Sequence, residues 1–171
     1  MQLPRLWTVA LLAAGCSPSL DWRETRAEGA GVVALFPCRP DRHARLVVVA
    51  GAATRMEMLV CSAGGATFAV SFLDLADPAT VTPALAELQA KAVSNIGGLQ
   101  ILSTPTQVSG MTPNAQSAHV AMTGRLPDGA AVQEQAAFFV KGLRVYQASV
   151  IGARLAPEVT ATFFAGLKLP S

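Results

Sequence analysis

Short apolar runs separated by turn residues begin near residue 32. VVALFP at residues 32–37 is a β-rich run that ends at proline, and three further runs follow over residues 45–75 with glycine-containing turns between them. In the second of these three runs, Arg55 and Glu57 alternate with apolar residues, which is the pattern of a strand with one solvated and one buried face. The pattern predicts antiparallel strands joined as a meander.

The hydrophobic period changes between residues 77 and 96. Apolar residues recur there at helical spacing, and they include Leu85 and Leu88. Pro83 lies early in the segment, and two glycines at residues 97–98 follow it. The spacing therefore predicts a helix over residues 77–96 with Leu85 and Leu88 buried.

The remainder of the chain returns to the strand pattern and ends in a second helix. The turn sequences LPDGA and KGLR are typical of hairpins between such strands. The predicted elements are strands at residues 100–108, 116–125, 130–140 and 144–152, and a helix that begins at Pro157. This order predicts an α+β fold, in which a long central helix and a C-terminal helix pack on an antiparallel β-sheet.

The first 15 residues have the order of an export signal. Arg5 supplies the positive region, residues 6–12 the apolar region, and residues 13–15 the small residues that precede cleavage. The apolar run is shorter than the roughly 20 residues that span a bilayer. Cys16 follows directly, and this junction resembles a bacterial lipobox, with Ala13 at the position that is usually leucine. An ordinary signal peptide and a buried N-terminal helix are the alternatives.

The lipobox resemblance implies a lipid anchor at Cys16. In such lipoproteins the cysteine sulfur takes a diacylglyceryl group, cleavage occurs before the cysteine, and its new amino group is acylated. Ser17 resembles the signal for sorting to an outer membrane, so we expect the chain on the periplasmic face of that membrane, with a tether that docks through Trp22. The expected organisation is a signal peptide over residues 1–15, a lipid-anchored tether over residues 16–31 and one domain over residues 32–171.

Export changes the interpretation of Cys38 and Cys61. Cysteines outside the cytosol are usually oxidised, so the two residues are predicted to form a disulfide. Such a bond closes a loop of about 24 residues and contributes about 3 to 4 kcal/mol on the chain-entropy model. A redox or metal pair is less well supported because the CxxC spacing is absent, and two separate buried thiols are the remaining alternative.

Composition limits the class of protein. The 171 residues are 51% apolar and 14% charged, which favours one globular domain. The chain has 13 Lys and Arg residues and 11 Asp and Glu residues, and Arg5 is the only charged residue among the first 15. A chain that begins at Cys16 therefore has 12 basic and 11 acidic residues, a net charge of +1, which argues against nucleic acid as a partner.

Sequence motifs for catalysis are missing from the chain. It contains no Gly-x-Ser-x-Gly nucleophile elbow, no His-Glu-x-x-His zinc motif and no Gly-x-x-x-x-Gly-Lys phosphate loop. We therefore predict no catalytic residue, no metal ligand and no cofactor.

A basic segment, RPDRHAR, follows the first predicted strand. Its arginines and histidine are candidates for contact with an anionic headgroup or a protein partner: Arg39, Arg42, His43 and Arg45. A solvated charged loop between strands explains the same residues more simply, because salt screens exposed charges.

Three other polar residues have simple structural interpretations. His119 lies in a strand pattern and is expected to be a half-exposed sheet residue, since a general base needs a positioned partner. Asp74 and Asp77 precede the predicted helix, where they fit a loop and an N-cap better than a cation site.

Several segments together resemble bacterial envelope lipoproteins of the PsbP-like superfamily. The resemblance lies in ALFPCRP, TRMEML, TFAVSF, the central helix, GRLPDG, RVYQASVIG and FFAGLKL, and it covers roughly residues 32–169. It implies an α/β/α domain, and it supplies no catalytic residues, because these motifs specify fold more than function.

The sequence leaves three function classes. The favoured one is a non-enzymatic, lipid-anchored domain that binds or supports another envelope protein. A hydrolase would need a pocket that joins His119 or His43 to a carboxylate and a nucleophile. A carrier of an apolar ligand would need a cavity between sheet and helix.

Overall fold

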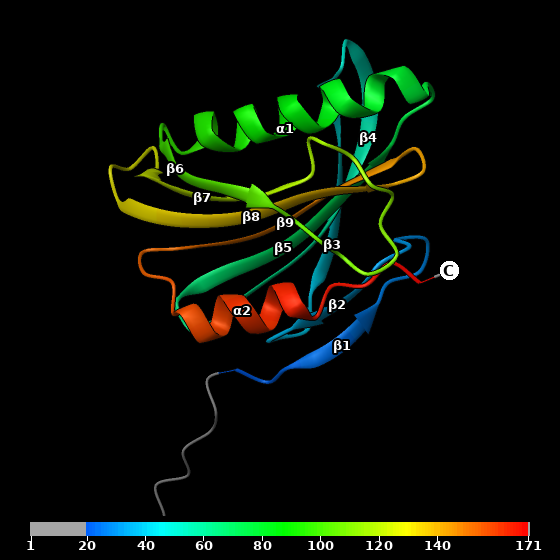
Figure 1. The fold of residues 1–171 in the computed structure, drawn as a ribbon. Helices are drawn as coiled ribbons and strands as arrows, with labels where there is room; N and C mark the ends of the chain where they lie inside the picture. The colour runs from blue at the N-terminus through cyan, green and yellow to red at the C-terminus, as the bar shows by residue number, and fades with distance from the viewer. Residues whose placement is uncertain (1–19, 171) are drawn as a thin grey trace, which may run out of the picture.

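The structure is a computed structural model that describes residues 20–170 (Figure 1). The predicted signal peptide, Cys16 and the first part of the predicted tether lie outside the described residues. Among the described residues, neither helix is long and apolar enough to cross a membrane.

A seven-stranded antiparallel sheet forms the centre of the fold, as the strand pattern predicted. Its spatial order is β3-β4-β5-β9-β8-β7-β6. Its strands are β3 Asp41–Val49, β4 Ala52–Ala63, β5 Ala66–Asp74, β6 Leu99–Pro105, β7 Ala118–Arg125, β8 Ala131–Lys141 and β9 Arg144–Gly152. With the two helices, the sheet confirms an α+β fold.

The predicted helix over residues 77–96 is present in two parts. A 3-10 turn, η1 Pro78–Thr80, is capped by the Asp77 side chain, which accepts a hydrogen bond from the Ala79 N–H. Helix α1, Val81–Asn95, continues from it. Leu85 and Leu88 are buried, as predicted. The C-terminal helix α2, Pro157–Ala165, begins at the predicted proline.

The two helices cover opposite faces of the sheet (Figure 1). Alternation along each strand supplies apolar side chains to both faces, so there are two buried clusters. On the α1 side, Leu85 packs with Met122 and Phe138. On the α2 side, Phe163 packs edge-to-face against Phe36 and Phe68.

The N-terminal hairpin departs from the prediction. Strands β1 Arg23–Arg26 and β2 Val33–Phe36 form their own two-stranded sheet, so VVALFP does not join the main sheet and the later part of the predicted tether is folded. The reason is tertiary burial: the Trp22 ring packs edge-to-face on Phe68, with ring centroids 5.9 Å apart. The expected docking through Trp22 is confirmed.

The basic segment also departs from the prediction of a charged loop. Residues from Asp41 onward form β3, an edge strand whose register pairs Arg42 with Leu59 and Arg45 with Met56. The charged side chains remain exposed because nothing in the described chain pairs with the outer side of β3. An edge strand therefore accommodates charges that would be excluded from a central strand.

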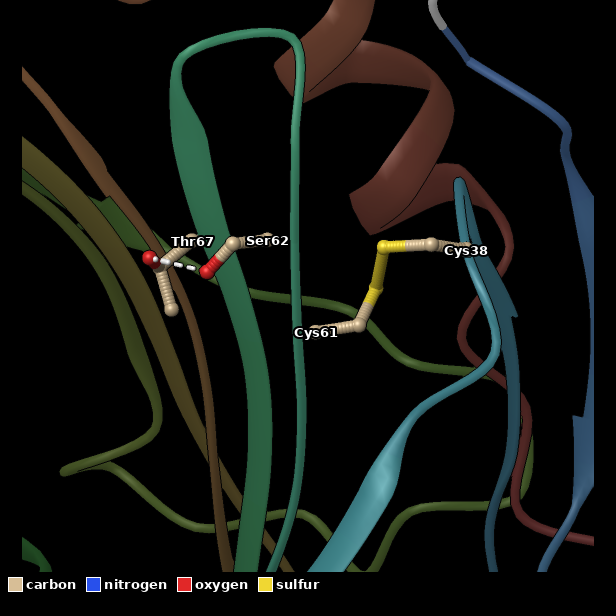
Figure 2. The surroundings of a disulfide bond; sticks show 4 residues. All are labelled: Cys38, Cys61, Ser62 and Thr67. Carbon is tan, nitrogen blue, oxygen red and sulfur yellow. Dashed lines mark hydrogen bonds between the residues drawn. A yellow bond between two sulfur atoms is a disulfide. The ribbon is translucent and has the colours of Figure 1, made fainter.

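Cys38 and Cys61 form the predicted disulfide, with Cα atoms 6.0 Å apart (Figure 2). Cys61 lies near the end of β4, and Cys38 follows β2, so the bond joins the N-terminal hairpin to the main sheet. Close by, the Ser62 and Thr67 hydroxyls share a hydrogen bond of 2.8 Å across the β4–β5 hairpin (Figure 2).

We predict that replacing both cysteines, in Cys38→Ala/Cys61→Ala, lowers the free energy of unfolding by about 3 kcal/mol, because the unfolded chain regains the entropy of an open loop. Urea unfolding of the full chain measures this change. The native protein in reducing buffer should show the same lowered midpoint, and a midpoint unchanged by either treatment would contradict a stabilising bond.

Candidate functional site

One part of the sheet face on the α2 side is left uncovered. Strand register fixes which side chains share a face, because directly paired residues point the same way. His119 marks the α2 side, since its ring lies 4.3 Å from the Phe164 ring of α2. We call the uncovered region the open face, and it consists of Leu99, Leu102 and Thr104 on β6, His119, Ala121 and Thr123 on β7, and Gln133 and Gln135 on β8.

None of these eight side chains is acidic, lysine or arginine, and the nearest charge in register is the exposed Arg125, two residues after Thr123 on the same side of β7. The open face continues to the edge strand β6, which pairs only with β7 among the described strands. Leu99, Ile101 and Leu102 are 76%, 65% and 57% exposed, so three large aliphatic side chains meet solvent within four residues. Clusters of this kind on a soluble domain usually mark an interaction surface.

The opposite edge of the sheet has a different chemistry. There β3 exposes Leu46 and Val48, but it also carries Arg42, His43 and Arg45. Charged side chains on an edge strand discourage pairing with another chain. Strand β6 lacks this protection, although a bulge between Gln100 and Leu102 interrupts its register with β7.

His119 lies at the inner end of the open face, in a cavity of about 300 Å³. The cavity is lined by Thr104, Gln107 and Phe164 and by aliphatic side chains such as Val108 and Leu167, so its wall combines hydroxyl, amide, aromatic and aliphatic groups. Burial lowers the pKa of His119, and the nearby Gln135 side chain opposes this shift. The imidazole is therefore neutral at pH 7, which keeps the open face uncharged.

The described residues give no catalytic arrangement around either histidine. His119 has Phe164 and Gln135 as neighbours, and His43 is exposed on β3. Neither forms a hydrogen bond to a carboxylate or hydroxyl group within residues 20–170. In the same part of the chain, no group of three or more His, Cys, Asp or Glu side chains is arranged to hold a metal ion. The hydrolase alternative gains no support from this geometry.

The predicted contact residues of the basic segment separate into two pairs. Alternation along β3 sends Arg42 to the α2 side, while His43 and Arg45 point to the other side, next to Met58. The cavity beside His43 and Arg45 measures only about 50 Å³. Arg39 precedes the strand and lines a surface cavity together with Arg42. The four residues therefore do not form a single site, and partner contact through either pair stays a prediction.

Arg42 is engaged in holding the N-terminal hairpin. Its Nε donates to Glu57 at 2.7 Å, and its Nη1 donates to the backbone carbonyl of Glu28 at 2.8 Å. The Arg42 hydrogen bond holds the pKa of the Glu57 carboxyl below its usual value. The Arg42 side chain is therefore occupied by bonds within the domain.

Arg144 binds the next residue of the β1–β2 turn, Gly29. Its Nε and Nη2 each donate to one oxygen of Asp74 at 2.7 Å, and its Nη1 donates to the Gly29 carbonyl at 2.5 Å. The pairing lowers the pKa of Asp74. The Tyr146 hydroxyl donates to the Ala30 carbonyl at 3.1 Å, so consecutive carbonyls of the β1–β2 turn are bound by the main sheet. We call Arg42, Arg144 and Tyr146 the hairpin clamp.

Glu134 is a buried carboxylate that lies on the α1 side, away from the open face. On β8 it stands between Val132 and Ala136, and its register partners are Met122 and Ile151, all of them apolar. The residue is 7% exposed. Burial without a charged partner raises the pKa of Glu134 to about 7.

The open face, the hairpin clamp and the buried Glu134 were not predicted from the sequence. Glu134 had a visible signal, because it interrupts an otherwise apolar series on alternate positions of β8. The segment LQILS, residues 99–103, had a weaker signal in the sequence: three aliphatic residues without strict alternation or charge near the start of a predicted strand. Arg144 had no sequence signal beyond its place after a hairpin turn.

No protein-family model and no curated protein matches this chain.

We predict that Glu134→Gln removes a pH dependence of stability. Since the folded-state pKa is raised from 4.5 to about 7, the native protein is most stable below pH 4.5 with respect to this group and loses that stability as pH rises through 7. At pH 8 the variant should exceed the native protein by up to roughly 3 kcal/mol, and at pH 4.5 the difference should be small. Urea unfolding at both pH values measures this effect.

Glu158→Gln serves as the control, because Glu158 is an exposed glutamate in the first turn of α2. This substitution should not reproduce the gain in stability at pH 8, because it removes no buried carboxylate. If the native protein and Glu134→Gln differ by the same amount at both pH values, the buried carboxylate does not titrate as described.

Proposed function

We propose that this chain is a lipid-anchored, non-enzymatic domain of the bacterial cell envelope that binds a second membrane-associated protein through the open face. The partner presents an uncharged, largely apolar surface. The observation that carries the proposal is the cluster of exposed Leu99, Ile101 and Leu102 on an edge strand without charge.

The chemistry of the open face supports this class of partner. Its amide and hydroxyl side chains can form hydrogen bonds with polar groups of a partner, and its leucines supply apolar contact area. A charged partner surface would lose hydration there and gain no opposite charge. An uncharged surface, paired along the outer side of β6 or packed on the face, avoids that cost.

The disulfide supports the envelope location. Disulfides persist in oxidising compartments and are rare in the cytosol, so a bond between Cys38 and Cys61 fits an exported chain. Export agrees with the signal-like order of residues 1–15 and with the lipobox resemblance at Cys16. The periplasmic face of the outer membrane remains the proposed location.

The finer fold assignment is part of the same proposal. Helices on both faces of an antiparallel sheet suit a PsbP-like α/β/α sandwich. The resemblance of residues 32–169 to such lipoproteins implies a binding or assembly-supporting role, and that role needs a surface such as the open face rather than a catalytic pocket.

Site-specific photo-crosslinking in intact cells tests the surface. A photoreactive amino acid at Leu102 should form a discrete crosslink to another membrane-associated protein, since that side chain is 57% exposed on the open face. Leu46 is the matched control, because it is a leucine that is 77% exposed on the other edge strand. Immunoblots of the two crosslinked samples give the comparison.

The outcomes separate the alternatives. A crosslink from position 102 but not from position 46, abolished by the charged variant Leu99→Glu, supports the proposal. A product with the mass of two copies of this chain would indicate self-association instead, and crosslinks only to lipid would indicate contact with the bilayer or with a bound apolar ligand. Either result, or equal crosslinking from both positions, contradicts a protein partner on the open face.

The anchor has its own prediction. Cys16→Ser should abolish lipid labelling and leave an uncleaved precursor, because the lipid is attached before the lipoprotein peptidase cuts. Mass spectrometry of the N-terminal peptide identifies the diacylglyceryl group on the native chain. If the Cys16→Ser protein is still cleaved and appears as a soluble exported domain, the chain has an ordinary signal peptide.

A further inference from the structure

The described part of the chain begins at Leu20, four residues after Cys16. The Leu20 side chain lies against Gly64, where an added Cβ would come within 3.0 Å of Leu20 Cδ2. The Asp21 N–H donates to the Pro37 carbonyl at 2.9 Å, and Trp22 packs on Phe68. The position of Leu20 on the domain is therefore fixed by packing on the β4–β5 turn.

From this spacing we infer that the sheet end with the β4–β5 turn faces the bilayer, an inference that rests on the lipid anchor proposed above. Four residues reach at most about 14 Å, whatever their conformation. Lipid chains on Cys16 insert in the membrane, so Leu20 and the turn beside it are held within about that distance of the headgroups. The partner of this end is a phospholipid surface.

Strand register identifies the rest of the bilayer-facing end. Ala66, the first residue of β5, pairs with Gly152, and a Cβ added to Gly152 would lie 2.9 Å from the Gly65 carbonyl. The loop that follows Gly152 therefore lies next to the β4–β5 turn. Ala153 and Arg154 of this loop are exposed.

The residues at this end suit the interface. The β4–β5 turn is Ala-Gly-Gly-Ala, which brings no charge or bulk against the headgroups. The exposed guanidinium of Arg154 is able to donate hydrogen bonds to lipid phosphates. No deep insertion is required, because the acyl chains supply the binding free energy.

The other end of the sheet is not held at the membrane by the anchor. Strand β4 has 12 residues, so the β3–β4 turn before Ala52 lies about 35 Å along the strand from Ala63. A spacer of about 14 Å keeps the β4–β5 turn beside the headgroups while Leu20 stays packed on Gly64, and it leaves the β3–β4 turn able to lie up to about 35 Å farther away. The short spacer and the docked N-terminus together therefore make the β4–β5 end the one that faces the bilayer.

Fluorescence quenching tests the orientation on the full lipidated protein, purified from membranes and reconstituted in vesicles of phosphatidylethanolamine and phosphatidylglycerol. Single cysteines labelled with an environment-sensitive fluorophore are placed at Ala153→Cys and Ala52→Cys, two exposed alanines at opposite ends of the sheet. Cys38 and Cys61 do not react, because they are oxidised. A lipid with a nitroxide on its headgroup is the quencher.

We expect severalfold stronger quenching at position 153 than at position 52. Mass spectrometry first verifies the lipid on Cys16. If the lipid is present and quenching is equal at both positions, or stronger at position 52, the orientation alone is overturned. If the purified native protein carries no lipid and does not bind the vesicles, the anchor itself is overturned, so the two failures are distinguishable. Circular dichroism of each labelled protein checks that the fold is retained.

A spacer variant isolates the cause. Insertion of about twelve glycine and serine residues after Ser17 lets the domain rotate and move away, because such a linker behaves as a flexible coil. The excess quenching at position 153 should then largely disappear. If it persists, the short spacer does not set the orientation.

Discussion

The width of the sheet, relative to the length of the elements that cover it, is the constraint on which the rest of the structure depends. Seven strands place the two edge strands about 29 Å apart, at about 4.8 Å per step. Helix α1, with 15 residues, is about 22 Å long, whereas α2, with 9, is only about 13 Å long. The α2 side therefore needs the β1–β2 hairpin as a second cover, and both together leave the open face on β6, β7 and β8 solvated.

The hairpin covers the sheet because its turn is bound by polar groups of the sheet beneath it. Arg144 donates to both carboxylate oxygens of Asp74 and to the Gly29 carbonyl, and its guanidinium lies 5.3 Å from the centroid of the Phe72 ring. Tyr146 binds the next carbonyl and is itself buried. Arg42 and Arg144 at this end of the α2 side are thus engaged in holding the hairpin, whereas the residues of the open face at the other end carry no charge and have no cover. This contrast makes the uncharged strand β6 the better candidate for a binding surface.

The local sequence pattern was sufficient to predict those strands and helices whose buried face is set by their own residues. Alternation around Glu57 and Phe72, glycine turns and the spacing of Leu85 and Leu88 predicted β4, β5 and α1, and the cysteines paired as expected. Strand β1 could not be predicted, because its sequence RETR is polar and pairs only once Trp22 is buried on Phe68. The open face escaped prediction for a related reason: exposure of Leu102 depends on how far α2 reaches, which no pattern near β6 encodes.

The register of the sheet connects the open face with the proposed anchor. Leu99 pairs with Thr123, Thr123 with Gln133, Gln133 with Gly152, and Gly152 with Ala66 at the β4–β5 turn. This row of paired residues crosses the sheet at the end where Leu20 is packed, so Leu99 belongs to the same end as the turn. With the domain held there by about 14 Å of chain, as proposed above, the open face would lie close to the headgroups rather than far into the periplasm. A partner that docks on Leu99 and Leu102 would then itself approach the membrane, and this favours an uncharged surface on a membrane-associated protein over one on a freely diffusing protein.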